Sequence, residues 1–229
     1  LGKKAKVDLK IHHSNSTLFC DIIESHLGEY DYYVIMPHFY ENVDEAYKVI
    51  DKIPSEQLLV LDKELAYPNP EYAAVYQDFQ NDIVEALETG LVTLRKYNKL
   101  TLVYPKIPSY PAEIVSGFRN FCMQNNFEYS IINEINLNDP IQDKEAFVVI
   151  EETDLVNLIK NCRSYKLKVG KDVGIISYND TPLKEILLEG ISVISTDHAK
   201  MGETAARLIL DNKREKIKNP FTLIQRKSL

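Results

Sequence analysis

Glycine is scarce in this sequence, with 8 glycines among 229 residues, and none of them form a phosphate-binding motif. Neither G-x-G-x-x-G nor G-x-x-x-x-G-K occurs, so the backbone cradle that holds a dinucleotide or ATP is not visible. The motifs G-x-S-x-G and H-E-x-x-H are also missing. His12 and His13 are adjacent, but neighbours on a strand point to opposite faces, which is poor geometry for a metal site. We therefore expect no cofactor, no metal ion and no catalytic residues.

Positive charge is also in short supply, because 34 Asp and Glu against 27 Lys and Arg give a formal net charge of -7. A nucleic-acid-binding surface needs clustered cations, so any DNA contact is expected to lie outside these residues. Cys20, Cys122 and Cys162 are far apart and form no C-x-x-C pair, which predicts buried, reduced thiols. No apolar run approaches the roughly 20 residues that cross a bilayer, and the first residues do not form a signal peptide. The expected location is the cytoplasm.

What the sequence does contain is an alternation of short apolar stretches with amphipathic segments. Because each crossover helix must bury its apolar stripe against a sheet, this pattern predicts an α/β fold with parallel sheets flanked by helices. About ten strands would be close to the limit for one open sheet, so two smaller sheets are favoured. Strands are predicted at residues 7–11, 32–36, 58–61, 100–104, 127–135, 146–150, 173–178, 191–195 and 221–225, and helices at 18–27, 43–53, 79–96, 111–126, 154–165, 182–189 and 200–212.

Polar residues follow most of the predicted strands. In open α/β sheets, ligands bind beyond the carboxyl ends of the strands, although strand ends also meet solvent in any such protein. Carboxylates, amides and hydroxyls bond hydroxyl groups, and tyrosine rings pack on the apolar face of a sugar, so a small polyhydroxylated ligand is expected. On their position alone, His38, Lys106 and Tyr110 are candidate ligand-binding residues. The strand-end groups are Pro37-His38, Asp62-Lys63, Pro105-Lys106, Glu151 to Asp154, Tyr178 to Asp180 and Thr196 to His198.

The carboxyl-terminal third, VGIISYNDTPLKEILLEGISVISTDHAKMGETAARLIL followed by NPFTLIQRKSL, resembles the effector domain of LacI/GalR-type bacterial transcription regulators. The resemblance lies in Tyr178-Asn179-Asp180 at a strand end, the alanine-rich helix starting at Met201-Gly202, and a terminal Leu-x-x-Arg-x-Ser. Earlier in the chain, the residues from Val75 to Asp78 and the stretch Ser116-Gly117-Phe118 are similar to family motifs. The segment SYNDTPLKEIL is most similar to the corresponding segment of the subset that carries a GntR-type winged-helix head amino-terminal to this domain.

This resemblance implies a two-lobed, periplasmic binding protein-like type I fold that binds its ligand in the cleft between the lobes. The expected lobes are residues 1–105 with 197–213, and residues 106–196 with 214–229, and the family's first strand would precede Leu1. Asn179 stands where the family has an aspartate that binds sugar hydroxyls, and residues 112–114 lack the family's pocket arginine, which leaves the sugar open. The residues that the resemblance places on the cleft wall are Asp78, Thr153, Asn179, Thr196 and His198, and Tyr178 is a further candidate from its position at a strand end.

The resemblance implies a ligand-sensing domain that binds a carbohydrate-like effector. Binding would change the DNA affinity of an amino-terminal head outside this chain. The domain is expected to be a homodimer and to have no membrane partner. A solute-binding transport receptor is the alternative; it predicts an export signal upstream and does not need Arg226-Lys227-Ser228. An enzyme with Glu151 or Asp154 as base is a third reading, although nothing in the sequence singles out a perturbed carboxylate. Those acidic residues could also hold a cation, but any helix start favours negative charge.

Overall fold

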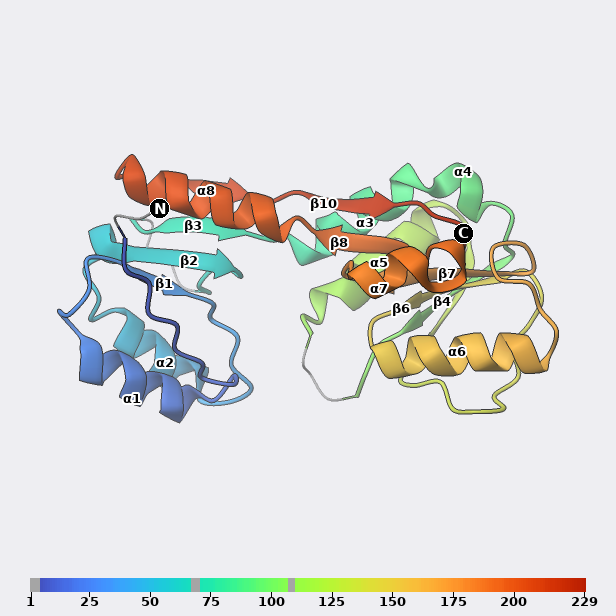
Figure 1. Ribbon diagram of the computed structural model, residues 1–229, viewed down its shortest axis with the longest axis horizontal. Helices are drawn as coiled ribbons and strands as arrows, with labels where there is room; N and C mark the ends of the chain where they lie inside the picture. Colours follow the sequence, from blue (N-terminus) through green and yellow to red (C-terminus); the bar gives the residue numbers. More distant parts are fainter. Residues whose placement is uncertain (1–4, 67–70, 107–109) are drawn as a thin grey trace. The chain divides into compact units, whose positions relative to one another are not determined.

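The structure is a computed structural model and describes residues 5–66, 71–106 and 110–229 (Figure 1). The chain divides into two compact units. Unit 1 comprises Leu1–Asp78 and Asp197–Pro220, and unit 2 comprises Phe79–Thr196 and Phe221–Leu229. The chain therefore passes from one unit to the other three times, and each unit is assembled from segments that are distant in the sequence.

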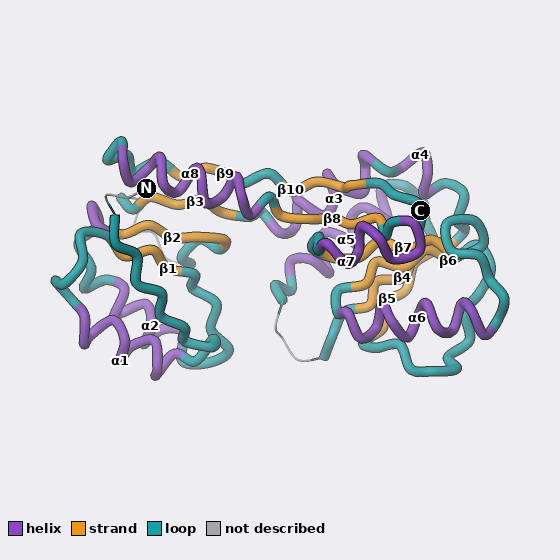
Figure 2. The backbone as a smooth tube through the Cα atoms, viewed as in Figure 1, coloured by secondary structure: helices purple, strands orange, loops and turns teal. Residues whose placement is uncertain are grey.

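Unit 1 is built on one parallel sheet (Figure 2). Its described strands lie in the order β1 (Tyr33–Ile35), β2 (Leu58–Asp62), β3 (Ala73–Tyr76) and β9 (Lys216–Lys218). Its described helices are α1 (Ser16–His26), α2 (Val43–Ile50), the short η2 (Ser55–Gln57) and α8 (His198–Leu210).

The alternation of side chains along β2 decides how the helices of unit 1 cover the sheet. Leu58 and Val60 pack with α1 and α2, whereas Leu59 points to the opposite face and packs with α8. Two of the helices begin at capping residues. The side-chain oxygens of Asn15 and Asp197 accept hydrogen bonds from backbone N–H groups in the first turns of α1 and α8, at 2.9 and 2.8 Å.

Unit 2 is built on a larger sheet. Its described strands lie in the order β10 (Phe221–Ile224), β8 (Ser192–Thr196), β7 (Val173–Tyr178), β6 (Glu145–Val149), β4 (Lys99–Val103) and β5 (Glu128–Ile132). Its described helices are α3 (Phe79–Thr89), α4 (Leu91–Leu94), α5 (Glu113–Gln124), α6 (Glu152–Ser164), α7 (Pro182–Ile186) and η3 (Leu187–Glu189).

Both faces of the unit 2 sheet are buried. Ala146 and Val148 of β6 pack with α3 and α5, and the alternating Phe147 and Val149 pack with α6. The approach of α3 to α5 requires Gly117, because a Cβ atom there would lie 2.2 Å from the backbone oxygen of Gln80.

The carboxyl-terminal segment closes this unit. The Ser228 hydroxyl donates to Ile175 O of β7 at 2.6 Å and accepts from Ser192 N at the start of β8 at 2.7 Å. The backbone oxygen of Ser228 also accepts from Ile175 N at 2.8 Å. The terminal motif seen in the sequence is therefore a set of contacts that ties two central strands to the chain's last residues.

Several expected elements differ in the structure. Residues 7–11 are not a strand: Val7, Leu9 and Ile11 are 74%, 83% and 59% exposed, and a strand exists only where a neighbouring strand pairs with it. β3 and β9 were not predicted, because both are short and flanked by charged or turn residues. β10 runs antiparallel to β8, so the sheet of unit 2 is not wholly parallel. The helix expected at residues 79–96 is interrupted at Gly90, which separates α3 from α4.

The unit boundaries also differ from two of the expected positions. The first lies after Asp78 rather than after residue 105, because α3 and β4 bury their apolar side chains in the core of unit 2. The last lies after Pro220 rather than after residue 213, because β9 pairs with β3 of unit 1. In both segments, the packing partner rather than a local sequence feature decides the unit.

The cysteine side chains are not equally buried. Burial raises the thiol pKa of Cys122 to about 12 and that of Cys162 to about 11, so neither is a reactive thiolate near neutral pH. Cys20, expected to be buried, is half-buried beside the core of unit 1, because it lies at the edge of the apolar face of α1. Along the described part of the chain, no helix is both long and apolar enough to cross a membrane.

Candidate functional site

The carboxyl ends of β7 and β8 bring several of the predicted residues together in unit 2. Tyr178 is the last residue of β7 and is paired with Ile194 of β8, two residues before Thr196. The Tyr178 ring meets the Tyr110 ring edge to face, with centroids 6.2 Å apart, and lies 5.5 Å from the ring of Phe221. Asn179 follows directly, and its N–H donates to Ile194 O at 2.8 Å. Three aromatic rings and an amide side chain therefore share this edge of the sheet.

The backbone at Asn179 is turned into the left-handed region, with φ of +60°. Asparagine tolerates this conformation better than most residues with a Cβ atom. The turn is held from three directions: Ile194 accepts from Asn179 N, the Ser195 hydroxyl oxygen accepts from Asp180 N at 3.0 Å, and Lys184 Nζ donates to the carbonyls of Tyr178 and Asn179.

Asp180 is committed to an ion pair. The Arg226 guanidinium donates to both of its carboxylate oxygens, at 2.9 and 2.7 Å, and also to Ile191 O at 2.9 Å. These hydrogen bonds hold the pKa of the Asp180 carboxyl below its ordinary value and raise the pKa of Arg226 above its own. Both carboxylate oxygens of Asp180 are therefore engaged within the protein, and its neighbour Asn179 stays a candidate residue.

Two side-chain oxygens of this turn are buried without a hydrogen-bond partner among the described residues: Asn179 Oδ1 and Thr181 Oγ1. A buried polar atom left unpaired costs about 1–3 kcal/mol, so such atoms are rare in folded proteins. The two oxygens belong to residues on either side of Asp180, in the turn that follows Tyr178, so this turn is a candidate site.

The other predicted residues of unit 2 differ in their exposure. Thr153 lies in the first turn of α6, beyond the end of β6, and Lys106 follows β4; both side chains are exposed. Thr196 is 9% exposed at the end of β8. Asp154, considered as a base, is 7% exposed, and its carboxylate accepts from Ile135 N at 2.8 Å. Desolvation raises the pKa of Asp154, but its hydrogen bond serves the fold rather than chemistry.

The remaining three predicted residues belong to unit 1. His38 follows β1, and its Nε2 lies 2.7 Å from Oδ2 of Asp62, the last residue of β2. Asp78 is half-buried after β3, and His198 is exposed at the start of α8. Asn219 joins the segments that carry these two residues: its N–H donates to Tyr76 O at 2.8 Å, and its side chain donates to Asp197 O at 3.1 Å.

Sequence reasoning missed Lys184, Arg226 and Asp62 as residues that hold the candidate groups in place. A lysine on a short helix is ordinarily expected to face solvent, so no pattern in the sequence singled out Lys184. Arg226 was noted only as part of a family motif, and Asp62 only as a strand-end residue. Asp62 and Arg226 contact their partners across 24 and 46 positions of sequence, separations that no local pattern encodes.

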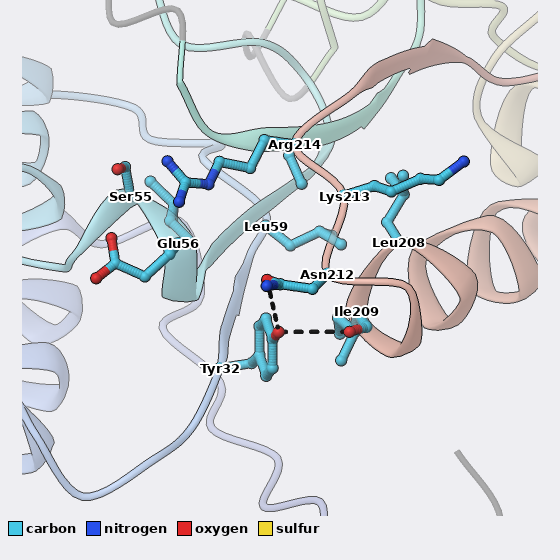
Figure 3. A pocket seen from close by; sticks show the side chains of 11 residues that line it. Tyr32, Ser55, Glu56, Leu59, Leu208, Ile209, Asn212, Lys213 and Arg214 are labelled. Carbon is cyan, nitrogen blue, oxygen red and sulfur yellow. Dashed lines mark hydrogen bonds between the residues drawn. The ribbon is translucent and has the colours of Figure 1, made fainter.

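A separate cavity lies in unit 1, at the amino-terminal ends of β2 and β3 and beside the end of α8 (Figure 3). Tyr32 donates its hydroxyl hydrogen there toward Ile209 O at 3.3 Å and toward Asn212 Oδ1 at 3.5 Å. Its volume of about 10 Å³ is room for a single water molecule, and it includes none of the predicted ligand residues. Among the described residues, no cluster of three metal-ligating side chains occurs.

A model of the periplasmic binding protein-like domain family matches residues 93–229, which is more than half of the chain. The dimeric Lac repressor with an 11-residue C-terminal deletion is similar in structure, with a TM-score of 0.74 and 16% identity over 97% of this chain and 86% of that chain. The Escherichia coli transcriptional repressor AscG gives a TM-score of 0.72 and 17% identity over 93% and 84%. The complex of the transcriptional regulator CelR with cellobiose gives 0.70 and 16% over 94% and 71%.

Identities this low show a shared fold, and a comparison with curated proteins finds no match. The family match begins within α4 and continues to Leu229. The chain belongs to the periplasmic binding protein-like domain family and has the type I α/β fold of LacI-family effector domains.

Proposed function

We propose that this chain is the effector-binding domain of a bacterial transcription regulator and that it binds a small, hydroxyl-rich molecule such as a sugar. The observation that carries the proposal is the turn after β7. There, the unpaired oxygen of Asn179 lies next to Tyr178, whose ring is packed against Tyr110. An amide that can accept and donate, beside aromatic rings, suits a ligand with hydroxyl groups on one side and C–H groups on the other.

The neutral side chain at position 179 bears on the class of ligand. An aspartate would accept hydrogen bonds only, whereas an asparagine also donates, so it bonds a hydroxyl group in either role. Thr181 and Thr196 add hydroxyl groups near the same strand ends. We propose Thr153 and Lys106 as more peripheral ligand contacts in unit 2, and His38, Asp78 and His198 as the contribution of unit 1.

The regulatory part of the proposal follows from the family. A ligand shifts a protein between conformations only by binding one of them more tightly, and typical couplings amount to about 1–3 kcal/mol. We propose that the chain acts as a homodimer in the bacterial cytoplasm, where its DNA is. We further propose that the DNA is contacted by a head amino-terminal to these residues, of the GntR winged-helix type. The similarity of SYNDTPLKEIL to that subset supports the choice of head, and the net charge of -7 is consistent with DNA contacts made elsewhere.

A thermal-shift screen of the 229-residue chain tests the ligand class. The compounds are cellobiose, D-glucose, D-xylose and D-gluconate, each with native protein, with Asn179→Ala and with Asn133→Ala. Asn133 is a matched control, since it is an exposed asparagine that follows β5 in the same unit. A compound present at 100 times its dissociation constant stabilises the native state by about 2.7 kcal/mol, which raises the unfolding midpoint visibly.

We expect at least one compound to raise the midpoint of the native chain and of Asn133→Ala, but not that of Asn179→Ala. If no compound shifts the native chain, the sugar class is wrong. If a shift persists in Asn179→Ala, a ligand binds but the assigned site is wrong. Ligand-dependent operator binding by the chain joined to its head would then separate a regulator from a transport receptor.

A further inference from the structure

Helix α7 carries a lysine that is almost completely buried. Lys184 is 3% exposed, although lysine is among the residues least often buried unless it is paired. Its ammonium donates to two backbone carbonyl oxygens, those of Tyr178 at 3.0 Å and Asn179 at 2.9 Å. Desolvation lowers the pKa of Lys184, and the carboxylates of Glu152 and Asp180 act in the opposite direction. The hydrogen bonds of this buried ammonium go to backbone carbonyl groups and not to a carboxylate, so an ion pair does not explain its position.

The two carbonyls converge on one ammonium because the chain turns at Asn179. With φ of +60°, this residue points its own carbonyl to the same side as the carbonyl before it. Without Lys184, both carbonyl oxygens would lose a charged hydrogen-bond donor. Lys184 therefore stabilises the left-handed turn at Asn179 more directly than any local preference of the sequence does.

Two side-chain oxygens of the same turn, Asn179 Oδ1 and Thr181 Oγ1, have no partner among the described residues, and Asn179 is the one at the left-handed position. Asp180 is occupied by Arg226, and its N–H by the Ser195 hydroxyl, whereas the Oδ1 atom of Asn179 has no partner within the described residues. The direction of the Asn179 side chain is set by the backbone turn, and the turn is closed by Lys184. Lys184, which is not itself a proposed ligand contact, thus sets the position of Asn179, which is one.

We propose that Lys184 is a positioning residue for the ligand site: its ammonium holds the carbonyls of Tyr178 and Asn179 and so fixes the turn that presents Asn179. The inference rests on the proposed function, since it concerns the same site. Its test has one arm that needs no ligand and one arm that does, so the two proposals fail separately.

The ligand-free arm measures amide hydrogen exchange by NMR in the 229-residue chain. Lys184→Met keeps an unbranched side chain and removes the donors; Lys160→Met is the matched control, at an exposed lysine of α6 in the same unit. We expect the amides of Asn179 and Asp180 to exchange at least about tenfold faster in Lys184→Met and at native rates in Lys160→Met, with Ile176 inside β7 unchanged in both. Native-like exchange at Asn179 in Lys184→Met overturns the proposal.

If Lys184→Met also releases Ile176, the unit has unfolded, and Lys184→Arg decides. Arginine keeps N–H donors at this position, so Asn179 should be protected within about threefold of native. Loss of protection at Asn179 while Ile176 stays protected in Lys184→Arg would count against a donor role for this side chain.

The ligand arm titrates cellobiose into the native chain, Lys184→Met, Asn179→Ala and the double variant by calorimetry. Each single variant should bind at least about tenfold more weakly. The double variant should bind no more weakly than Asn179→Ala, because Lys184 acts through Asn179. Additive losses overturn the positioning role. Absence of cellobiose binding by the native chain counts against the sugar proposal, and hydrogen exchange then still decides the role of Lys184.

Discussion

In unit 2, the turn after β7 is bonded by three side chains, a buried lysine, a serine hydroxyl and an arginine; in unit 1, one pair of side chains, His38 and Asp62, joins the ends of β1 and β2. Lys184, Ser195 and Arg226 each contribute a hydrogen bond to residues 178–180, whereas His38 and Asp62 share a single contact at 2.7 Å. The side chains of that pair are 31% and 19% exposed. The two sets of strand ends both carry polar residues, but they differ in the number of side chains that bond them.

The inner strands of the two sheets also differ in how completely they are buried. The residues of the inner strands β6, β7 and β8 of unit 2 are buried throughout, whereas the inner strands β2 and β3 of unit 1 end in half-buried residues. The lesson is that a polar strand end becomes a defined site when surrounding elements bond its backbone. Binding residues need support from neighbours as much as they need the right chemistry. Unit 2 therefore supplies the better-defined half of the proposed ligand contacts.

Two helix glycines provide the sharpest test of this contrast, and the largest expected effect. Gly117→Ala in unit 2 should destabilise the protein by about 3 kcal/mol, because the added Cβ atom would lie 2.2 Å from Gln80 O. Gly202→Ala in unit 1 should stabilise it by up to about 1 kcal/mol, because nothing lies within 4 Å and alanine favours helix. Urea unfolding measures both. A Gly117→Ala protein of native stability would mean that α3 and α5 are not closely packed.

The second largest effect is expected for the ion pair of unit 2 between Arg226 and Asp180. Arg226→Ala should cost about 2 kcal/mol at pH 7, because it leaves a largely buried carboxylate without its donor. His38→Ala, which breaks the pair of unit 1, should cost less than about 1 kcal/mol, because that pair is more exposed. Urea unfolding at neutral pH compares the two variants directly.

The dependence of stability on pH gives the same comparison an independent readout. The folded pKa of Asp180 is lowered, so its stabilising contribution is fully present above the unfolded pKa of about 3.9 and is lost as the pH falls through the folded value. Native protein should therefore lose more stability than Arg226→Ala between about pH 5 and pH 2. Parallel pH profiles for the two proteins would show that Asp180 does not depend on Arg226.

The smallest effect is expected in the extended segment of unit 1. Leu9→Gln should change the free energy of unfolding by no more than about 0.5 kcal/mol, because Leu9 is 83% exposed. Leu59→Ala in β2, at 1% exposure, should cost about 3 kcal/mol in the same assay. A cost above about 1 kcal/mol for Leu9→Gln would mean that residues 5–12 are packed in solution, and the contrast between the units would then be smaller.

The periodicity of the sequence was enough for most of the fold. Residues 173–178 were predicted as a strand and form β7 over the same range, because six consecutive apolar or small residues are bounded by charged and turn residues. The expectation for residues 7–11 was wrong for an instructive reason. An alternating pattern shows that a segment could pair, but whether it does depends on a partner strand. β9 was missed for the converse reason, since its residues Lys216, Ile217 and Lys218 become a strand only through pairing with β3.

The sequence by itself determined the α/β class, the placement of polar groups after strands, and the resemblance that names Asn179 and Asp78. These are properties of spacing and residue type, which a linear chain carries locally. The tertiary structure decided which unit each segment joins and which of two adjacent polar residues, Asn179 or Asp180, is held in an ion pair. Arg226 occupies Asp180 from 46 positions away, and only packing brings such distant groups into hydrogen-bond range. That contact, together with the two bonds from Lys184, separates Asn179 as a candidate ligand residue from Asp180 as a structural one.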